Sequence, residues 1–271
     1  MIHSVANALD ERLDPFRWRD RQLASKSDRR ETVGAGLFVA EGDLVVDRAL
    51  QAGCTPQALL CDDDMAARFH SQLPHVDIFC GNEDLRRDVT GLGVPLRAVG
   101  LFQRPPLRDV SELLHSGSRI VVAESLDNPT NLGAIIRSAA ALGWHGLVLS
   151  AGSADPLARR ALRVSMGTGL TLPFARLQDD ESLHDLLTTH GYRSVALTPH
   201  HTGVSLQQYT VRADEKVAVL LGSERDGLAT ETIFHATDMV RIPMHAHVDS
   251  LNVGAAAAIV LYALGPQTNS Y

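Results

Sequence analysis

The second half of the chain alternates short apolar runs with stretches of helical spacing. The apolar runs predict five buried strands, at residues 120–123, 147–149, 195–197, 217–221 and 240–242. Apolar positions three and four residues apart predict four helices, at residues 131–142, 156–164, 181–189 and 251–264. Ser250 is the expected N-cap of the last helix, because its hydroxyl can accept a backbone hydrogen bond. Strands that alternate with helices predict an α/β fold with a parallel sheet covered on both faces.

The first hundred residues show the same two patterns in a smaller α/β unit. The predicted strands lie at residues 58–61, 76–80 and 96–102. The predicted helices lie at residues 43–53 and 82–89. The stretch Gln103-Arg104-Pro105-Pro106 then interrupts the pattern, because proline cannot continue a helix or a central strand. A polar segment follows it. We therefore expect two domains, residues 1–108 and 109–271.

Composition is typical of a globular protein without a membrane anchor. Apolar residues make up 45% of the chain, which is ordinary for a globular core. The longest apolar stretch, residues 253–264, is too short to span a bilayer, and the N-terminus is too polar for a secretion signal. The three cysteines are widely spaced and odd in number, which predicts buried thiols rather than disulfides: Cys54, Cys61 and Cys80. These features predict a cytoplasmic protein.

The net charge of -7 argues against a general nucleic-acid-binding protein, because phosphate contacts require basic residues. A local basic face is still compatible with this charge. The candidate is a run of seven cations near the N-terminus: Arg12, Arg17, Arg19, Arg21, Lys26, Arg29 and Arg30. Because acidic residues interrupt the run, a solvated helical face explains it as well as an RNA contact does.

The signatures of the common nucleotide and metal enzymes are missing. Gly34-Ala35-Gly36 and Gly167-Thr168-Gly169 both lack the third glycine of a dinucleotide-binding loop, which argues against an oxidoreductase. The sequence contains no Walker A lysine motif and no nucleophile elbow. Four histidines lack a recognisable ligand spacing, so no metal is expected: His200, His201, His245 and His247.

Polar loops follow three of the predicted strands. The first, residues 127–133, leads into the helix that carries Arg137, and the second, residues 221–227, follows the most apolar strand. The third runs from residue 242 to residue 252 and opens the last helix. Each polar residue alone could be a cap or a turn residue. Their joint occurrence after strands indicates a ligand site, because ligands bind at the carboxyl ends of strands in α/β sheets.

The three loops resemble the motifs of the SpoU, or TrmH-like, branch of the SPOUT RNA ribose methyltransferases. Residues 131–143 are similar to the first motif, residues 221–228 to the second, and residues 242–253 to the third, with its Ile-Pro-Met and Ser-Leu-Asn sequences. The resemblance covers residues 119–264. His245-Ala246-His247 departs from it, because the family usually carries a glycine-bearing loop there. The sequence at residues 38–42 is similar to the ribosomal L30e-like RNA-binding domain that precedes many of these catalytic domains.

The resemblance implies a fold, a cofactor and a set of site residues. It implies a C-terminal trefoil knot, which is an exception to the rule that chains avoid threading, and a homodimer that uses the last helix. S-adenosylmethionine is the implied methyl donor. The implied catalytic residues are Asn131, Arg137, Glu224, Ser250 and Asn252, and the implied cofactor-binding residues are Thr198, Gly222, Ile242 and Leu251.

Arg137 has a specific role in the resemblance, which is to activate the ribose hydroxyl. Because a guanidinium stays protonated in proteins, binding an RNA phosphate and polarising the hydroxyl oxygen are physically easier roles than general base catalysis. The predicted function is therefore methyl transfer to a ribose 2'-hydroxyl of a structured RNA, with ribosomal RNA as the first choice. A transfer RNA substrate, or a non-catalytic RNA-binding protein with the same fold, remains an alternative.

Overall fold

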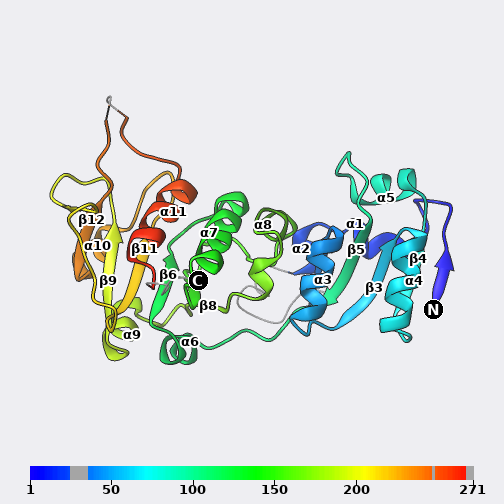
Figure 1. Cartoon of the computed structure of the whole chain (residues 1–271), viewed down its shortest axis with the longest axis horizontal. Helices are drawn as coiled ribbons and strands as arrows, with labels where there is room; N and C mark the ends of the chain where they lie inside the picture. The colour runs from blue at the N-terminus through cyan, green and yellow to red at the C-terminus, as the bar shows by residue number, and fades with distance from the viewer. Residues whose placement is uncertain (25–35, 246–247, 267–271) are drawn as a thin grey trace. The chain divides into compact units, whose positions relative to one another are not determined.

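The computed structural model describes residues 1–24, 36–245 and 248–266 (Figure 1). The chain forms two compact units: residues 1–106 with residues 157–171, and residues 107–156 with residues 172–271. Each unit contains its own β-sheet, which confirms the predicted fold class. The trefoil knot and the functional division between residues 108 and 109 stay predictions.

The first unit is built on a mixed five-stranded sheet. Its strand order is β1 (Ile2–Ser4), β4 (Asp77–Cys80), β3 (Pro56–Cys61), β5 (Ala98–Gln103) and β2 (Leu37–Glu41). Strand β5 runs antiparallel to both of its neighbours, whereas β1, β4 and β3 are parallel. The helices of the unit are α1 (Asp14–Arg17), α2 (Asp20–Leu23), α3 (Asp43–Gln51), α4 (Asp63–Gln72), α5 (Glu83–Thr90) and α8 (Arg159–Val164).

Helix α8 belongs to this unit although it lies far along the chain. Arg159 donates to Glu41 at 2.6 Å, and Arg163 forms a second ion pair with the same carboxylate. The Glu41 side chain is only 1% exposed, and a buried carboxylate of this kind is costly without such partners. Arg159 also donates to the carbonyl oxygens of Phe16 and Trp18. The ion pairs therefore attach residues 157–171 to strand β2.

The cysteines of this unit behave as core residues. Cys61 and Cys80 are buried, and Cys54 is half-buried. Burial raises the pKa of both the Cys61 and the Cys80 thiol to about 12. Neither thiol is therefore a ready nucleophile at neutral pH.

The second unit is built on seven strands that are all parallel. Their order is β10 (Val204–Ser205), β12 (Asp238–Arg241), β9 (Tyr192–Leu197), β11 (Lys216–Leu221), β6 (Arg119–Ala123), β7 (Gly146–Leu149) and β8 (Phe174–Arg176). The helices are α6 (Val110–Ser116), α7 (Pro129–Ala141), α9 (Leu183–Thr189), α10 (Thr230–His235) and α11 (Val253–Leu264). The five predicted strands of this half are all present. None of the described helices is long and apolar enough to cross a membrane.

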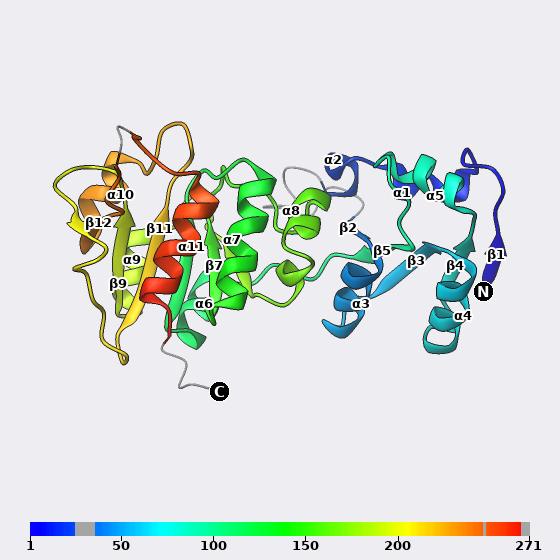
Figure 2. The same cartoon turned by 45° about the horizontal axis from the view of Figure 1, so that its top comes forward.

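Alternate residues of the central strands bury against helices on opposite faces of this sheet. Val121 and Val219 belong to the core beneath α7 and α11, which lie side by side (Figure 2). Val122 and Ala218 belong to the core on the other face, with residues of α6 and α9. The apolar runs of β6 and β11 are continuous because both of their faces are covered. Because the strands are parallel, their carboxyl ends meet at one edge, where the three polar loops emerge.

Candidate active site

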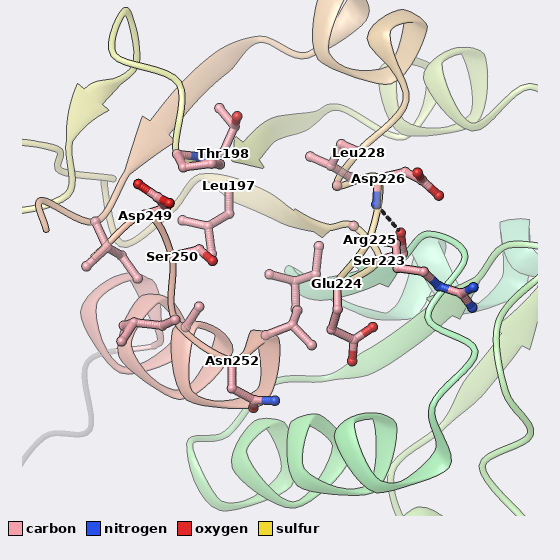
Figure 3. A pocket seen from close by; sticks show the side chains of 18 of the residues that line it. Leu197, Thr198, Ser223, Glu224, Arg225, Asp226, Leu228, Asp249, Ser250 and Asn252 are labelled. Carbon is pink, nitrogen blue, oxygen red and sulfur yellow. Dashed lines mark hydrogen bonds between the residues drawn. The ribbon is translucent and has the colours of Figure 1, made fainter. Parts of the chain in front are cut away.

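A pocket of about 700 Å³ lies at the carboxyl ends of strands β9, β11 and β12 (Figure 3). This volume is typical of a small-molecule site. Its walls include all four predicted cofactor-binding residues: Thr198, Gly222, Ile242 and Leu251. They also include three of the five predicted catalytic residues: Glu224, Ser250 and Asn252. Residues separated by up to 54 positions in the sequence therefore share one cavity, as the parallel topology requires.

A chain of side-chain hydrogen bonds joins the three polar loops. The Asn131 amide donates to the Glu224 carboxylate, and the Asn252 amide donates to the Asn131 side-chain oxygen at 3.0 Å. Asn131 does not line the pocket and is 92% buried, with 8% of its surface exposed. Glu224 and Asn252 lie at the same end of the pocket (Figure 3). Asn131 therefore fixes the positions of two pocket residues.

Asn252, rather than Ser250, is the N-cap of α11, so the predicted cap is wrong. The Asn252 side-chain oxygen accepts from the backbone N–H of Gly254 at 3.0 Å and of Ala255 at 3.4 Å. The helix begins at Val253 because this amide satisfies its first donors. Ser250 lies two residues earlier, exposed at the pocket wall. Its hydroxyl is therefore available to a ligand.

Gly222 is required by the closure of its own loop. A Cβ atom at this position would lie 2.1 Å from the Gly227 carbonyl carbon and 2.2 Å from the Leu228 nitrogen. The loop is closed by two backbone hydrogen bonds between Ser223 and Gly227, at 3.1 and 3.0 Å. The packing shows that the residue allows the chain to approach itself.

Arg137 lies apart from the pocket in this chain. It is exposed on α7 between buried residues of the sheet-facing side, and it is not among the pocket-lining residues. Within the part of the chain that the structure describes, its guanidinium has no hydrogen-bond or ion-pair partner. Arg108 is the other such cation in this unit. The remaining seven are held by carboxylates or carbonyl oxygens: Arg119, Arg176, Arg193, Arg212, Lys216, Arg225 and Arg241.

The second unit is acidic, and so is the pocket. Its nine Lys and Arg residues face sixteen Asp and Glu residues, so it carries the whole net charge of -7. Among the described residues of its wall, the pocket has Glu224, Asp226 and Asp249 but a single Lys or Arg cation, Arg225. Acidic walls attract a cationic ligand. The sequence did not predict Asp226 and Asp249 as site residues, because nothing but their place in the polar loops distinguished them.

The amino ends of strands β9 and β12 are joined by a half-buried polar cluster. Arg193 of β9 donates to Asp238 of β12 at 2.5 Å, and the Tyr209 hydroxyl donates to the same carboxylate at 2.8 Å. The bond from Arg193 holds the pKa of Asp238 below its usual range. Burial, followed by the bond to Asp238, raises the pKa of Tyr209. The cluster ties β9 to β12, whose opposite ends form the pocket.

The comparisons with known proteins agree with this geometry. The model of the SpoU rRNA Methylase family matches residues 118–262. The chain belongs to that family. This SpoU protein is 35% identical over 266 residues to an uncharacterized tRNA/rRNA methyltransferase of Mycobacterium tuberculosis, which covers 96% of this chain and 91% of the relative. It is 28% identical over 246 residues to a 23S rRNA guanosine 2'-O-methyltransferase of Bacillus subtilis, covering 90% of this chain and 93% of that one.

A solved structure extends the likeness to both units of the SpoU protein. The AdoMet-bound rRNA methyltransferase from Sinorhizobium meliloti superimposes with a TM-score of 0.80 and 26% identity, over 97% of each chain. The sequence predictions of the family, of an S-adenosylmethionine-dependent RNA methyltransferase and of its cofactor are confirmed. The family match also removes the oxidoreductase as an alternative. The individual site residues and their roles stay predictions.

The pocket fits S-adenosylmethionine on its own features. Leu197, Ile242 and Leu251 offer apolar walls for a flat adenine, and the backbone of the 222–228 loop offers polar groups nearby. The carboxylates suit the positive charge of the sulfonium and ammonium groups. Among the described residues, no three His, Cys, Asp or Glu side chains are placed to hold a metal ion.

Proposed function

We propose that this SpoU protein methylates a ribose 2'-hydroxyl of ribosomal RNA. The observation that carries the proposal is the pocket at the strand ends, with the Glu224–Asn131–Asn252 chain of hydrogen bonds at one end. The relative from Bacillus subtilis, named as a 2'-O-methyltransferase of 23S rRNA, supports both the acceptor and the RNA class. Transfer RNA is the second candidate, because the mycobacterial relative is named for either RNA.

The proposed chemistry requires positioning rather than covalent catalysis. When bound, S-adenosylmethionine would supply the methyl group of its sulfonium: transfer to the 2'-oxygen breaks the sulfur–methyl bond, leaves S-adenosylhomocysteine and releases the hydroxyl proton to water. Thr198, Gly222, Ile242 and Leu251 hold the cofactor, and the exposed Ser250 hydroxyl and Glu224 carboxylate meet the ribose. Holding the 2'-oxygen in line with the methyl carbon accounts for much of the rate enhancement. Arg137 lies outside the pocket of its own chain, on the helix that packs beside α11. In the homodimer proposed below, its free guanidinium therefore acts at the pocket of the partner subunit, where it binds a phosphate next to the reacting ribose and polarises the hydroxyl.

We propose that the two units divide the work of binding and catalysis. The methyltransferase unit is acidic, so it repels the RNA backbone except near its free cations. The first unit has sixteen cations and sixteen carboxylates, and therefore no net repulsion.

Part of its predicted basic run is neutralised, since Arg12 pairs with Asp10, and Arg17 with Asp14. Lys26, Arg29 and Arg30 lie outside the described residues. Arg19 and Arg21 are exposed and have no ion-pair partner among the described residues.

A double substitution tests this division. Replacing Arg19 and Arg21 with alanine should weaken RNA binding and lower the slope of log affinity against log salt by roughly one to two, because each lost phosphate contact removes about one unit. The affinity for the cofactor should not change. Arg87, which pairs with Asp84, provides the matched control. Equal RNA affinity and equal salt slope in the double variant and the wild type would rule out these cations as RNA contacts.

We propose that the protein is a homodimer that uses α11. Ala255, Ile259 and Tyr262 are exposed on this helix, at spacings of four and three residues that place them on one face. Tyr262 is 79% exposed and Ile259 is 42% exposed. An apolar stripe of this kind is typical of a helix that packs against a partner. A cytoplasmic location is part of the same proposal, because the substrate is an RNA.

The proposal of an RNA class is tested with unmodified RNA. The full-length protein and methyl-labelled S-adenosylmethionine are mixed with ribosomal RNA or with transfer RNA, each purified from cells that lack the enzyme. We expect label in ribosomal RNA and little in transfer RNA. Label in transfer RNA alone would overturn the proposed substrate class, while leaving the methyltransferase assignment intact. Sedimentation of the same preparation should give twice the chain mass of 29.3 kDa.

A further inference from the structure

Glu124 contacts both ends of the loop that forms one wall of the cofactor pocket. This residue follows the last residue of β6, and its backbone N–H donates to the Leu221 carbonyl oxygen at 2.8 Å. Its side-chain carboxylate accepts from the backbone N–H of Ala229 at 2.7 Å and from the Thr232 hydroxyl at 2.6 Å. Leu221 directly precedes the loop of residues 222–228, and Ala229 directly follows it. The Ser223–Gly227 bonds close the loop itself, and Glu124 ties together the two residues that flank it.

The carboxylate also supplies what α10 lacks. This helix begins at Thr230, and its N-cap, Ala229, has no capping side chain. Glu124 accepts the hydrogen bond from the N-cap backbone and bonds Thr232 in the first turn. A negative charge at this end also interacts favourably with the helix dipole. Because α10 buries none of its residues fully, packing alone holds its start weakly.

The middle of the loop is held from the same segment of the chain. Arg225 donates to Asp127 at 2.7 Å, although both side chains are largely exposed, so this pair contributes little. Glu224 is bound by Asn131. Neither contact restrains the end of the loop at Ala229. In the described part of the chain, the side-chain hydrogen bonds at that end come from Glu124.

The backbone changes direction immediately after Glu124. Ser125, the next residue, has a φ of 52°, which is a left-handed conformation that costs free energy for a residue other than glycine. Its backbone N–H donates to the Ser150 hydroxyl at 2.8 Å. The chain thus turns sharply at the end of β6. Glu124 itself does not line the pocket, so any effect on the cofactor must act through the loop.

We propose that Glu124 is a positioning residue that sets the shape of the cofactor pocket by fixing both ends of the 222–228 loop. The loop contributes the wall from Gly222 to Leu228, of which Ser223 to Asp226 and Leu228 are labelled in Figure 3. Helix α10 contributes Ile233. Release of Ala229 and Thr232 lets this wall move away from the pocket. The proposal rests on the assignment of the pocket to S-adenosylmethionine.

Calorimetric binding of S-adenosylhomocysteine to the full-length protein tests the proposal. Glu124→Ala should raise the Kd about tenfold or more, whereas RNA affinity in the absence of cofactor stays at the wild-type value. Glu124→Gln should restore most of the affinity, because its amide oxygen can accept from Ala229 and its amide nitrogen can donate to the Thr232 oxygen. Thr232→Val, which removes one of the two side-chain bonds, should give an intermediate Kd.

Glu112→Ala, at an exposed glutamate of α6, is the matched control and should bind like the wild type. A wild-type Kd in both Glu124→Ala and Thr232→Val would overturn the role of Glu124. So would equal losses in Glu124→Ala and Glu124→Gln, since the shape-conserving variant should recover. If Glu124→Ala does not fold, the other two variants decide the question. Failure of the wild type itself to bind would contradict the pocket assignment instead.

Discussion

Arg137→Ala is expected to slow methyl transfer by about 10²–10⁴-fold at saturating RNA, which is the usual cost of losing a group that acts on a transferred proton. The fold and the affinity for S-adenosylhomocysteine should remain close to the wild type, because Arg137 is exposed and does not line the pocket. Its guanidinium is one of two in the methyltransferase unit without a partner among the described residues. The other cations of this unit, apart from Arg108, are bound by carboxylates or carbonyl oxygens, so the Arg137 guanidinium is available to bind the RNA substrate.

Single-turnover kinetics separate the two roles of Arg137. A rate loss that persists at saturating RNA places the guanidinium at the reacting oxygen. A contact to phosphate alone would cost roughly 1.5–3 kcal/mol of RNA binding and would disappear at saturation. Arg108→Ala is the matched control, because Arg108 is the other free cation of the unit. Normal methylation by Arg137→Ala at low RNA concentration would remove Arg137 from the active site.

Gly222→Ala is expected to weaken binding of S-adenosylhomocysteine by between about fivefold and 150-fold, the range that corresponds to an overpacking cost of roughly 1–3 kcal/mol. The added methyl group would lie 2.1 Å from backbone that has no side chain to move aside. The loop must therefore open, and the bonds between Ser223 and Gly227 lengthen. The pocket wall moves with them.

Gly152→Ala provides the control for this substitution. Its added Cβ would meet the Ser125 hydroxyl at 3.3 Å, which a side-chain rotation relieves. This variant should bind S-adenosylhomocysteine like the wild type. Gly222→Ala with unchanged affinity would show that the loop shape does not determine the cofactor site.

The strands and the motif loops were predictable because they depend on local pattern. The run at residues 217–221 is apolar at nearly every position, and β11 is buried on both faces. The polar residues that follow it therefore had to lie at the carboxyl edge of the sheet. Helix α10 was not predictable, because none of its residues is fully buried and no apolar period marks it.

The contacts that complete the site could not be predicted, because they join distant residues. Ser250 and Asn252 are both good N-cap residues, and the choice of Asn252 is linked to its bond with Asn131, 121 positions away. Glu124 was missed because its partners lie 105 and 108 positions away. The attachment of residues 157–171 to the first unit depends in the same way on Glu41. Local pattern cannot reveal such pairs.

The most direct test of the function is the position of the transferred methyl group. Ribosomal RNA labelled by the full-length protein is digested to nucleosides, which are separated and identified by mass. The expected label is in a 2'-O-methylated ribonucleoside, and a 2'-deoxy substitution at that nucleotide should abolish transfer, since the 2'-hydroxyl is the acceptor. Label on a base, or undiminished transfer to the 2'-deoxy substrate, would contradict the proposed reaction.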